Sequence, residues 1–187
     1  MIHLSFEQEN TLIKNLLLAN DVPEKDAISL AAVVTHSDFT GTYSHGLSRL
    51  CIYLRQYMAG ALVAQPEWKI VKDEGAAISF DCGGGSGIVA VNTVYDEVLK
   101  RARKYGVAAG TGRHSANIGC GGYYGHRMAE DNVIGIVMSN TYPCQAPYLG
   151  ADRLIGTNPI IMGAPTSNPE RPIVIDISTS GVAIGKV

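Results

Sequence analysis

The hydrophobic pattern of this chain changes near residue 60, and this change restricts the folds it can adopt. Through residues 1–60, apolar residues recur at helical spacing, with a capping box that begins at Ser5 and a helix-starting Pro23. From residue 61 onward, short apolar runs alternate with turns and further helical stretches. We therefore predict an α/β protein in which a helical N-terminal unit, residues 1–60, packs on a mixed sheet built from residues 61–187.

The positions of the expected elements follow from the same pattern. In the N-terminal unit we predict helices after Ser5, from Pro23 toward Phe39, and from a capping Ser44 to Gly60. Further on we predict helices over 88–105 and 123–131, and strands over 68–73, 76–82, 107–109, 133–139, 160–164 and 173–177. Residues 181–187 resemble the beginning of another element, so we expect a C-terminal portion to be missing.

Composition argues against several classes of protein. The formal net charge is −2 and Lys and Arg form no cluster, which disfavours a nucleic-acid partner. No apolar run has the length of a membrane span, and the N-terminus lacks the basic and apolar regions of a signal peptide. The four cysteines are spread without a Cys-x-x-Cys pair, so we expect reduced thiols, no metal site and a cytoplasmic protein.

The segment of residues 43–53 contains the side chains best suited to chemistry on a small molecule. It combines a hydroxyl (Ser44), an imidazole (His45) and a guanidinium (Arg49). On one helix, His45 and Arg49 would share a face about 6 Å apart. A histidine transfers protons near neutral pH, and an arginine fork binds a carboxylate through two hydrogen bonds, so the group suits a small acid with a reactive carbonyl or hydroxyl. The alternative is a capping serine, a solvated histidine and a surface arginine.

Two glycine-rich stretches precede predicted helices. Residues 83–87 lack both the final glycine of a dinucleotide fingerprint and the Lys-Ser/Thr of a phosphate loop, so a flexible strand-to-helix turn is the better interpretation. Residues 110–125 are predicted to form a long loop that contains Arg113, His114 and Asn117. Ordering such a loop costs conformational entropy, which favours a ligand site here. The alternative is that Arg113 and His114 are solvated loop residues.

Polar residues also adjoin several predicted strands. They occupy 139–143, 156–159 and 176–181, where ligand contacts are common in open α/β sheets. The last stretch, Asp176-Ile-Ser-Thr-Ser-Gly181, offers an acid and three hydroxyls that suit ribose or phosphate oxygens. The alternative is an ordinary strand exit with a cap for the next helix.

The residues give little support to a serine hydrolase. Ser, His and Asp are all present, but the chain has no Gly-x-Ser-x-Gly elbow. Ser44 and His45 are adjacent, and adjacent residues on a helix do not face each other. We therefore do not expect a hydrolase at this segment.

Taken in order, four segments resemble the family of type-2 malate/L-lactate dehydrogenases, which also includes ureidoglycolate dehydrogenases, diketogulonate reductases and sulfolactate dehydrogenases. These segments are Ser44-His45-Gly46-x-x-Arg49, the Gly-Gly-Tyr-Tyr run at 121–124, residues 154–159 and Asp176-Ile-Ser-Thr-Ser180. The resemblance covers essentially the whole chain. It implies an NAD- or NADP-dependent oxidoreductase that interconverts small 2-hydroxy and 2-oxo acids, or acts on cyclic imines of similar shape. It also implies a non-Rossmann fold and a homodimer.

The resemblance assigns roles to individual residues. His45 would be the proton donor or acceptor at the substrate oxygen with Ser44 beside it, and Arg49 would hold the substrate carboxylate. The dinucleotide would contact Thr141, Asp176, Ile177, Ser178, Thr179 and Ser180. These roles agree with the chemistry, because hydride addition to a carbonyl builds negative charge on oxygen, which a nearby imidazolium stabilises and protonates.

The chain departs from the family in two respects. Many members have a catalytic or orienting histidine in the loop Arg-x-Ser-x-His-x-Gly, and Asn117 occupies that position here. Asparagine donates hydrogen bonds but does not shuttle protons at pH 7. We hypothesise that His45 is the sole proton shuttle; the alternatives are that His114 moves in or that the substrate differs. Family members are also much longer, so the alternative function is a truncated relative that binds small acids without turnover.

Overall fold

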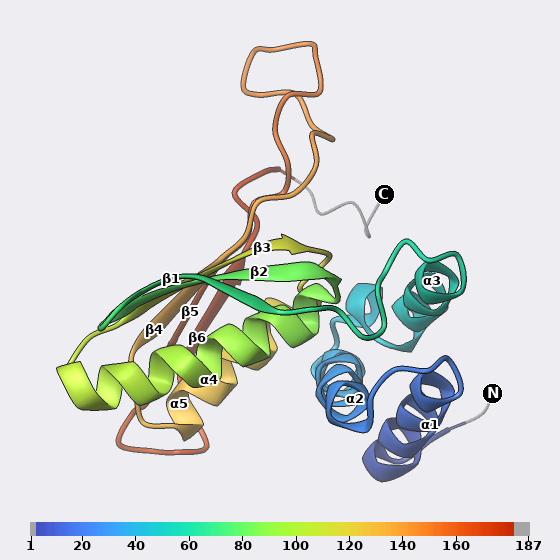
Figure 1. The fold of residues 1–187 in the computed structure, drawn as a ribbon, viewed down its shortest axis with the longest axis horizontal. Helices are drawn as coiled ribbons and strands as arrows, with labels where there is room; N and C mark the ends of the chain where they lie inside the picture. Colours follow the sequence, from blue (N-terminus) through green and yellow to red (C-terminus); the bar gives the residue numbers. More distant parts are fainter. Residues whose placement is uncertain (1–2, 182–187) are drawn as a thin grey trace.

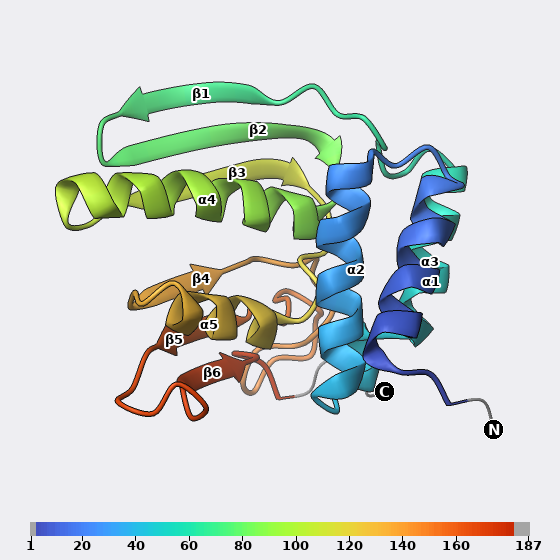
Figure 2. The same ribbon diagram turned by 90° about the horizontal axis from the view of Figure 1, so that it is seen from below.

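The computed structural model describes residues 3–181, which form a helical layer at one end of two α/β layers (Figures 1 and 2). Its helices are α1 (Phe6–Leu18), α2 (Glu24–Phe39), the short 3₁₀ turn η1 (Tyr43–His45), α3 (Leu47–Met58), α4 (Gly87–Tyr105) and α5 (Gly121–Glu130). Figure 2 shows α2 crossing the ends of α4 and α5, so the helical layer meets both α/β layers. No helix among the described residues is long and apolar enough to cross a membrane.

The N-terminal helices form because capping and apolar spacing agree. Ser5 Oγ accepts the Gln8 N–H at 3.2 Å and Gln8 Oε1 accepts the Ser5 N–H at 2.9 Å, which confirms the predicted capping box. Buried side chains of α1, α2 and α3 form one cluster with Ile88 and Val89 of α4. Burial of each large aliphatic side chain contributes about 1.5–3 kcal/mol. This cluster therefore fixes α3 against the α/β layers.

Two three-stranded sheets make up the α/β layers. The first has the order β1 (Lys69–Glu74), β2 (Ala77–Gly85), β3 (Ala109–Ser115), and the second has the order β4 (Gly135–Met138), β5 (Ile160–Ala164), β6 (Ile173–Ile177). Strands β2 and β3 are parallel and joined by α4, whereas all other pairs are antiparallel. Helix α5 packs on the second sheet so closely that a Cβ at Gly163 would lie 2.3 Å from the Gly125 oxygen.

The α/β class is confirmed, but two details of the prediction are wrong. The sheet is split in two, and only the first sheet is mixed. Strand β3 reaches Ser115, so the first half of the predicted loop at 110–125 is a strand. A Cβ at Gly110 would lie 2.5 Å from Val98, so this glycine is required by the close packing of α4 rather than by a loop. The element predicted at 181–187 lies outside the described residues from 182 onward.

The second sheet has an apolar face that no described element covers. Val137, Ile161 and Val174 point toward α5. Strand alternation places the intervening residues on the opposite face, where Ile136, Met162 and Ile175 pair across the three strands. Their exposed fractions are 57%, 38% and 40%. We call this the outer face of the second sheet; it also carries Met138, Ile173 and Ile177.

We expect the 187-residue chain to self-associate through the outer face of the second sheet, because large exposed apolar patches favour association in water. Replacing Ile136 and Ile175 together with threonine should shift the chain toward the monomer in sedimentation velocity, with an unchanged circular dichroism spectrum. Ile70→Thr, at a 59% exposed position of the first sheet, is the matched control. Equal self-association of the parent and the double variant would contradict this prediction.

Candidate active site

The turn between α2 and α3 brings Ser44 and His45 into contact. Ser44 Oγ lies 2.9 Å from His45 Nδ1, and the Thr42 N–H donates to the Ser37 carbonyl at 2.7 Å, which ties the turn to the end of α2. The expectations that Ser44 caps α3 and that it cannot face His45 are both wrong, because both residues lie in η1 rather than in an α-helix. The hydroxyl therefore orients the imidazole, and the ring tautomer decides which atom donates.

Helix α3 begins at Leu47 and receives its N-terminal cap from α2. Asp38 Oδ2 accepts the Leu47 N–H at 2.6 Å, while the N-cap residue Gly46 has no side chain to do so. The positive end of the helix dipole also stabilises a carboxylate at this place. A Cβ at Gly46 would lie 2.0 Å from Asp38 Oδ1, so this approach requires glycine. Sequence reasoning missed Asp38; the available signal was a helix start whose N-cap glycine leaves an N–H without a local acceptor.

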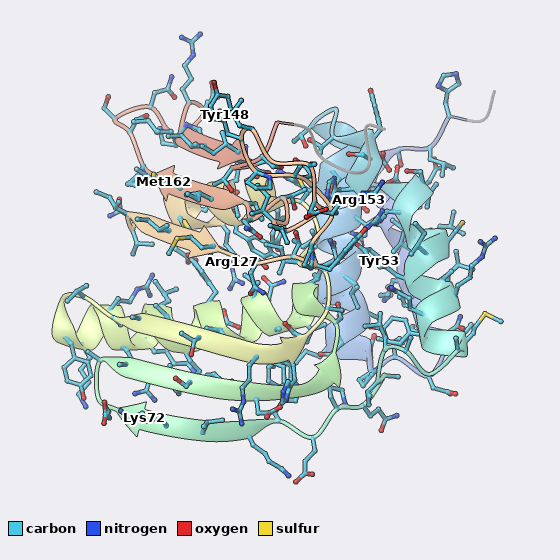
Figure 3. The ribbon with its side chains drawn as sticks, turned by 90° about the horizontal axis from the view of Figure 1, so that it is seen from above. Tyr53, Lys72, Arg127, Tyr148, Arg153 and Met162 are labelled. Carbon is cyan, nitrogen blue, oxygen red and sulfur yellow. The ribbon has the colours of Figure 1, made fainter. Side chains whose placement is uncertain are left out.

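Arg49, Tyr53 and Asn117 form a second group. Figure 3 shows Tyr53 on the side of α3 that faces the sheets. The Tyr53 hydroxyl donates to Asn117 Oδ1 at 2.9 Å, and the same oxygen accepts the Gly119 N–H at 2.9 Å. Burial raises the pKa of Tyr53 to about 12, against the opposing effect of Arg49, so the hydroxyl stays protonated. The Arg49 Nε–H is buried and has no hydrogen-bond partner within the described residues. Arg49 therefore retains donor capacity beside a fixed Tyr53–Asn117 pair.

His114 lies on β3 and is engaged with a different partner. Its Nδ1 is 3.0 Å from Asp81 Oδ2, and the Arg113 Nε–H donates to the same oxygen at 3.2 Å. The pKa of Asp81 is lowered mainly by the Gly83 N–H and further by these two side chains. The structure therefore places Arg113 and His114 in an ion-pair group on the first sheet, not beside His45.

A polar strip lies where the strands of the second sheet meet their loops; its members are Thr141, Thr157, Asn158, Ser178, Thr179 and Ser180. Thr141 Oγ1 accepts the Thr157 N–H at 2.8 Å, and Ser178 Oγ donates to the Thr157 carbonyl at 3.0 Å. The Ser178 and Ser180 hydroxyls are 2.6 Å apart. Thr141, Thr157 and Asn158 belong to the loop between β4 and β5, which Figure 1 shows in orange, projecting beyond the layers. Four residues of the predicted cofactor set are thereby brought together through Thr157 and Asn158, which lie in the polar stretch 156–159 noted in the sequence but were not assigned a role there.

The two remaining residues of the predicted cofactor set diverge. Asp176 Oδ2 accepts the Gly122 N–H at 2.7 Å, at the N-terminus of α5. A Cβ at Gly121 would lie 2.7 Å from Asp176 Oδ1, so this contact requires glycine as well. Ile177 is 52% exposed and belongs to the outer face of the second sheet. Strand alternation therefore separates Asp176 from Ile177.

Residues 117–122 connect the helical group to the second sheet. At one end Asn117 accepts the Tyr53 hydroxyl, and at the other the Gly122 N–H donates to Asp176. The Tyr124 hydroxyl holds the middle of the segment through the Ile118 carbonyl at 2.6 Å. One short segment thus fixes α3, the start of α5 and the end of β6 relative to one another.

The chemistry of the polar strip fits a dinucleotide better than a metal. Its hydroxyls both donate and accept, which suits ribose hydroxyls and an amide, and Asp176 adds a carboxylate acceptor nearby. Among residues 3–181, no three His, Cys, Asp or Glu side chains are grouped as metal ligands. The strip and Asp176 therefore offer hydrogen-bonding groups of the kind that a dinucleotide requires.

Comparison with known proteins agrees with the family resemblance found in the sequence. A sequence model described as malate/L-lactate dehydrogenase matches residues 4–187. Malate dehydrogenase of Pyrococcus abyssi is 34% identical over 177 residues, which are 95% of this chain and 48% of that protein. The (2R)-3-sulfolactate dehydrogenase (NADP(+)) of Chromohalobacter salexigens is 33% identical over 98% of this chain and 55% of that protein. The structure of malate dehydrogenase from Pyrococcus horikoshii OT3 superposes with a TM-score of 0.94 at 32% identity, over 99% of this chain and 53% of that one.

This chain belongs to the malate/L-lactate dehydrogenase family. It spans about half the length of the curated relatives it matches. The resemblance inferred from the four sequence segments is thereby confirmed.

Replacing Asn117 with alanine is expected to destabilise the chain by about 1–3 kcal/mol, because two part-buried hydrogen bonds, from the Tyr53 hydroxyl and the Gly119 N–H, would lose their acceptor. Urea unfolding followed by circular dichroism measures the loss. Asn140→Ala, at an exposed position, is the control and should change the unfolding free energy by less than about 0.5 kcal/mol. Equal unfolding midpoints for Asn117→Ala and the parent would contradict the role of Asn117 as that acceptor.

Proposed function

We propose that this chain is the substrate- and cofactor-binding part of an NAD- or NADP-dependent oxidoreductase that interconverts small 2-hydroxy and 2-oxo acids. The observation that carries the proposal is the placement of an oriented imidazole, His45, just before a helix that presents Arg49, whose Nε–H has no hydrogen-bond partner among residues 3–181. An acid–base group and a carboxylate-binding group at one helix start suit a 2-oxo acid, which has a carboxylate next to its reactive carbonyl.

In the proposed reaction, Arg49 binds the substrate carboxylate and fixes which face of the carbonyl is presented. His45 donates a proton to the carbonyl oxygen during reduction and removes it during oxidation, with Ser44 holding the ring. Asn117 does not transfer a proton; it orients Tyr53 next to Arg49. His45 is thus the sole proton shuttle of the described site.

The proposed dinucleotide site consists of Thr141, Asp176, Ile177 and residues 178–180, with Thr157 and Asn158 as additional members. When bound, the nicotinamide supplies or accepts the hydride. We assign residues 1–60 to a substrate-binding unit and residues 61–187 to a cofactor-binding domain. The homodimer and the cytoplasmic location implied by the resemblance and by the unpaired thiols belong to the same proposal.

Isothermal titration calorimetry with NADH and NADPH tests the cofactor site. We expect saturable binding of at least one of them, in the micromolar to sub-millimolar range common for such ligands. Because the relatives are longer, the titration includes a second protein, in which this chain is fused to the C-terminal half of the Pyrococcus horikoshii enzyme. Absence of binding by both folded proteins would contradict the proposal.

A non-catalytic relative that binds small acids is the second candidate function. It is favoured by Asn117, whose oxygen is occupied by Tyr53 and Gly119 and whose amide does not shuttle protons. Calorimetric binding of a 2-oxo acid by the fused protein, without consumption of reduced nicotinamide, would favour this candidate over the dehydrogenase.

A further inference from the structure

Two carboxyl groups meet behind the His45 turn, one from α1 and one from α2. Glu9 is only 7% exposed, and its Oε1 is buried with no hydrogen-bond partner among the described residues. Its neighbour is Asp38, whose Oδ2 accepts the Leu47 N–H at 2.6 Å. A carboxyl without a cation is an unusual occupant of a helix interface, because burial of a charge without a partner is costly.

The two carboxyl groups do not have the same surroundings. Asp38 accepts the Leu47 N–H at the N-terminus of α3, and both this donor and the helix dipole favour a negative charge at that place. Glu9 has no comparable donor; burial and the nearby Asp38 carboxyl raise its pKa to about 7. Glu9 therefore holds a proton below that pH and serves as a neutral hydrogen-bonding neighbour of Asp38. Asp38, on α2, is the charged neighbour that raises the pKa of Glu9 beyond the effect of burial.

Asp38 also determines where the catalytic turn lies. Gly46 approaches its carboxyl so closely that a Cβ would lie 2.0 Å from Oδ1. The Gly41 N–H bonds to the Asp38 carbonyl at 3.1 Å, so Asp38 contacts both the start of the connecting turn and the start of α3. His45 immediately precedes Gly46, and Arg49 lies in the first turn of α3. A movement of Asp38 would therefore displace both residues together.

We propose that the buried Glu9 and the half-buried Asp38 together position the 43–46 turn and the start of α3, so that His45 and Arg49 act on the same small acid. Glu9 and Asp38 are positioning residues, since neither is placed against substrate or cofactor. The identity of the ligand rests on the proposed function, whereas the positioning itself does not.

The test uses NMR of the 187-residue chain, with no substrate present. Leu47 amide exchange reports the cap, and the ring nitrogen signals of His45 report the turn. Asp38→Ala should speed Leu47 amide exchange at least tenfold and shift the His45 ring signals, and Asp38→Asn should give a smaller change of the same kind, because its amide oxygen still accepts. Glu9→Gln should leave both signals unchanged at pH 6, since it reproduces a protonated glutamate.

A pH series distinguishes the pair from a simple packing contact. The folded-state pKa of Glu9, about 7, lies above its ordinary value of 4.5, so the folded chain holds the extra proton between these values. The contribution of Glu9 to the free energy of unfolding is therefore most favourable below pH 4.5. It decreases as the pH rises from 4.5 to about 7. We expect the Tm to fall by about 5–10 °C over this range. Glu9→Gln should remove most of that fall, and Glu7→Gln, at an exposed position of α1, should retain it.

The inference would be overturned if Asp38→Ala had the same Leu47 amide exchange rate and the same His45 ring signals as the parent chain. An equal fall of Tm with pH in Glu9→Gln and the parent would also overturn it. Both readouts are independent of turnover, so an inactive chain would count against the proposed function and not against the positioning role.

Discussion

Replacing His45 with asparagine is expected to slow the reduction of a 2-oxo acid by about 10²- to 10⁴-fold, the usual contribution of a positioned general acid. Asparagine retains hydrogen-bonding capacity toward Ser44, whose oxygen is 2.9 Å from the imidazole in the parent, but it does not donate a proton at neutral pH. Calorimetric binding of the reduced cofactor and of the 2-oxo acid should be retained, while single-turnover rates in the fused protein fall.

His114→Asn is the matched control for this variant. His114 is exposed and bonded to Asp81 on the first sheet, so its replacement should leave turnover within a few-fold of the parent. Parent-like turnover in His45→Asn would contradict the role of His45. A large loss in His114→Asn instead would identify His114 as the proton shuttle.

Replacing Arg49 with lysine is expected to raise the KM for the 2-oxo acid by about 10- to 100-fold, which corresponds to the loss of one charge-assisted hydrogen bond of roughly 1.5–3 kcal/mol. Lysine keeps the positive charge but lacks the planar fork that binds a carboxylate through two parallel bonds. The buried Nε–H, which has no partner among residues 3–181, would also be removed. Binding of the cofactor, proposed for the polar strip, should change little.

The control for this change is Arg55→Lys, at an exposed position near the end of α3. It should leave the KM within about twofold, as expected for a surface substitution. If Arg49→Lys also leaves the KM unchanged, Arg49 does not bind the substrate carboxylate.

Local structure was predictable wherever neighbours in the sequence determine it. The capping box at Ser5 and the left-handed turn at Gly106, which ends α4 with a φ of 86°, both depend on residues within a few positions. Apolar spacing likewise predicted most helices and strands. It failed at β3, where Gly110 permits α4 to approach, because a glycine needed for packing looks the same in sequence as a glycine needed for a turn.

The candidate site was less predictable, because its contacts join distant parts of the chain. Tyr53 and Asn117 are 64 positions apart, and Gly122 and Asp176 are 54 positions apart. The resemblance supplied the residue identities of the site but not these contacts. The local pattern also predicted Ser44 as the cap of the third helix, whereas the 3₁₀ turn lets Ser44 reach His45 and leaves the cap to Asp38. Such assignments depend on which elements pack together, which local patterns do not specify.

The central claim is tested most directly by following the oxidation of NADH and NADPH by this chain, alone and fused to the C-terminal half of the Pyrococcus horikoshii enzyme, with a panel of 2-oxo acids. The expected result is consumption of at least one reduced cofactor that requires a 2-oxo acid and yields the 2-hydroxy acid in equal amount. It should be lost in His45→Asn and retained in His114→Asn. A folded fused protein that binds cofactor and 2-oxo acid but transfers no hydride would contradict the claim.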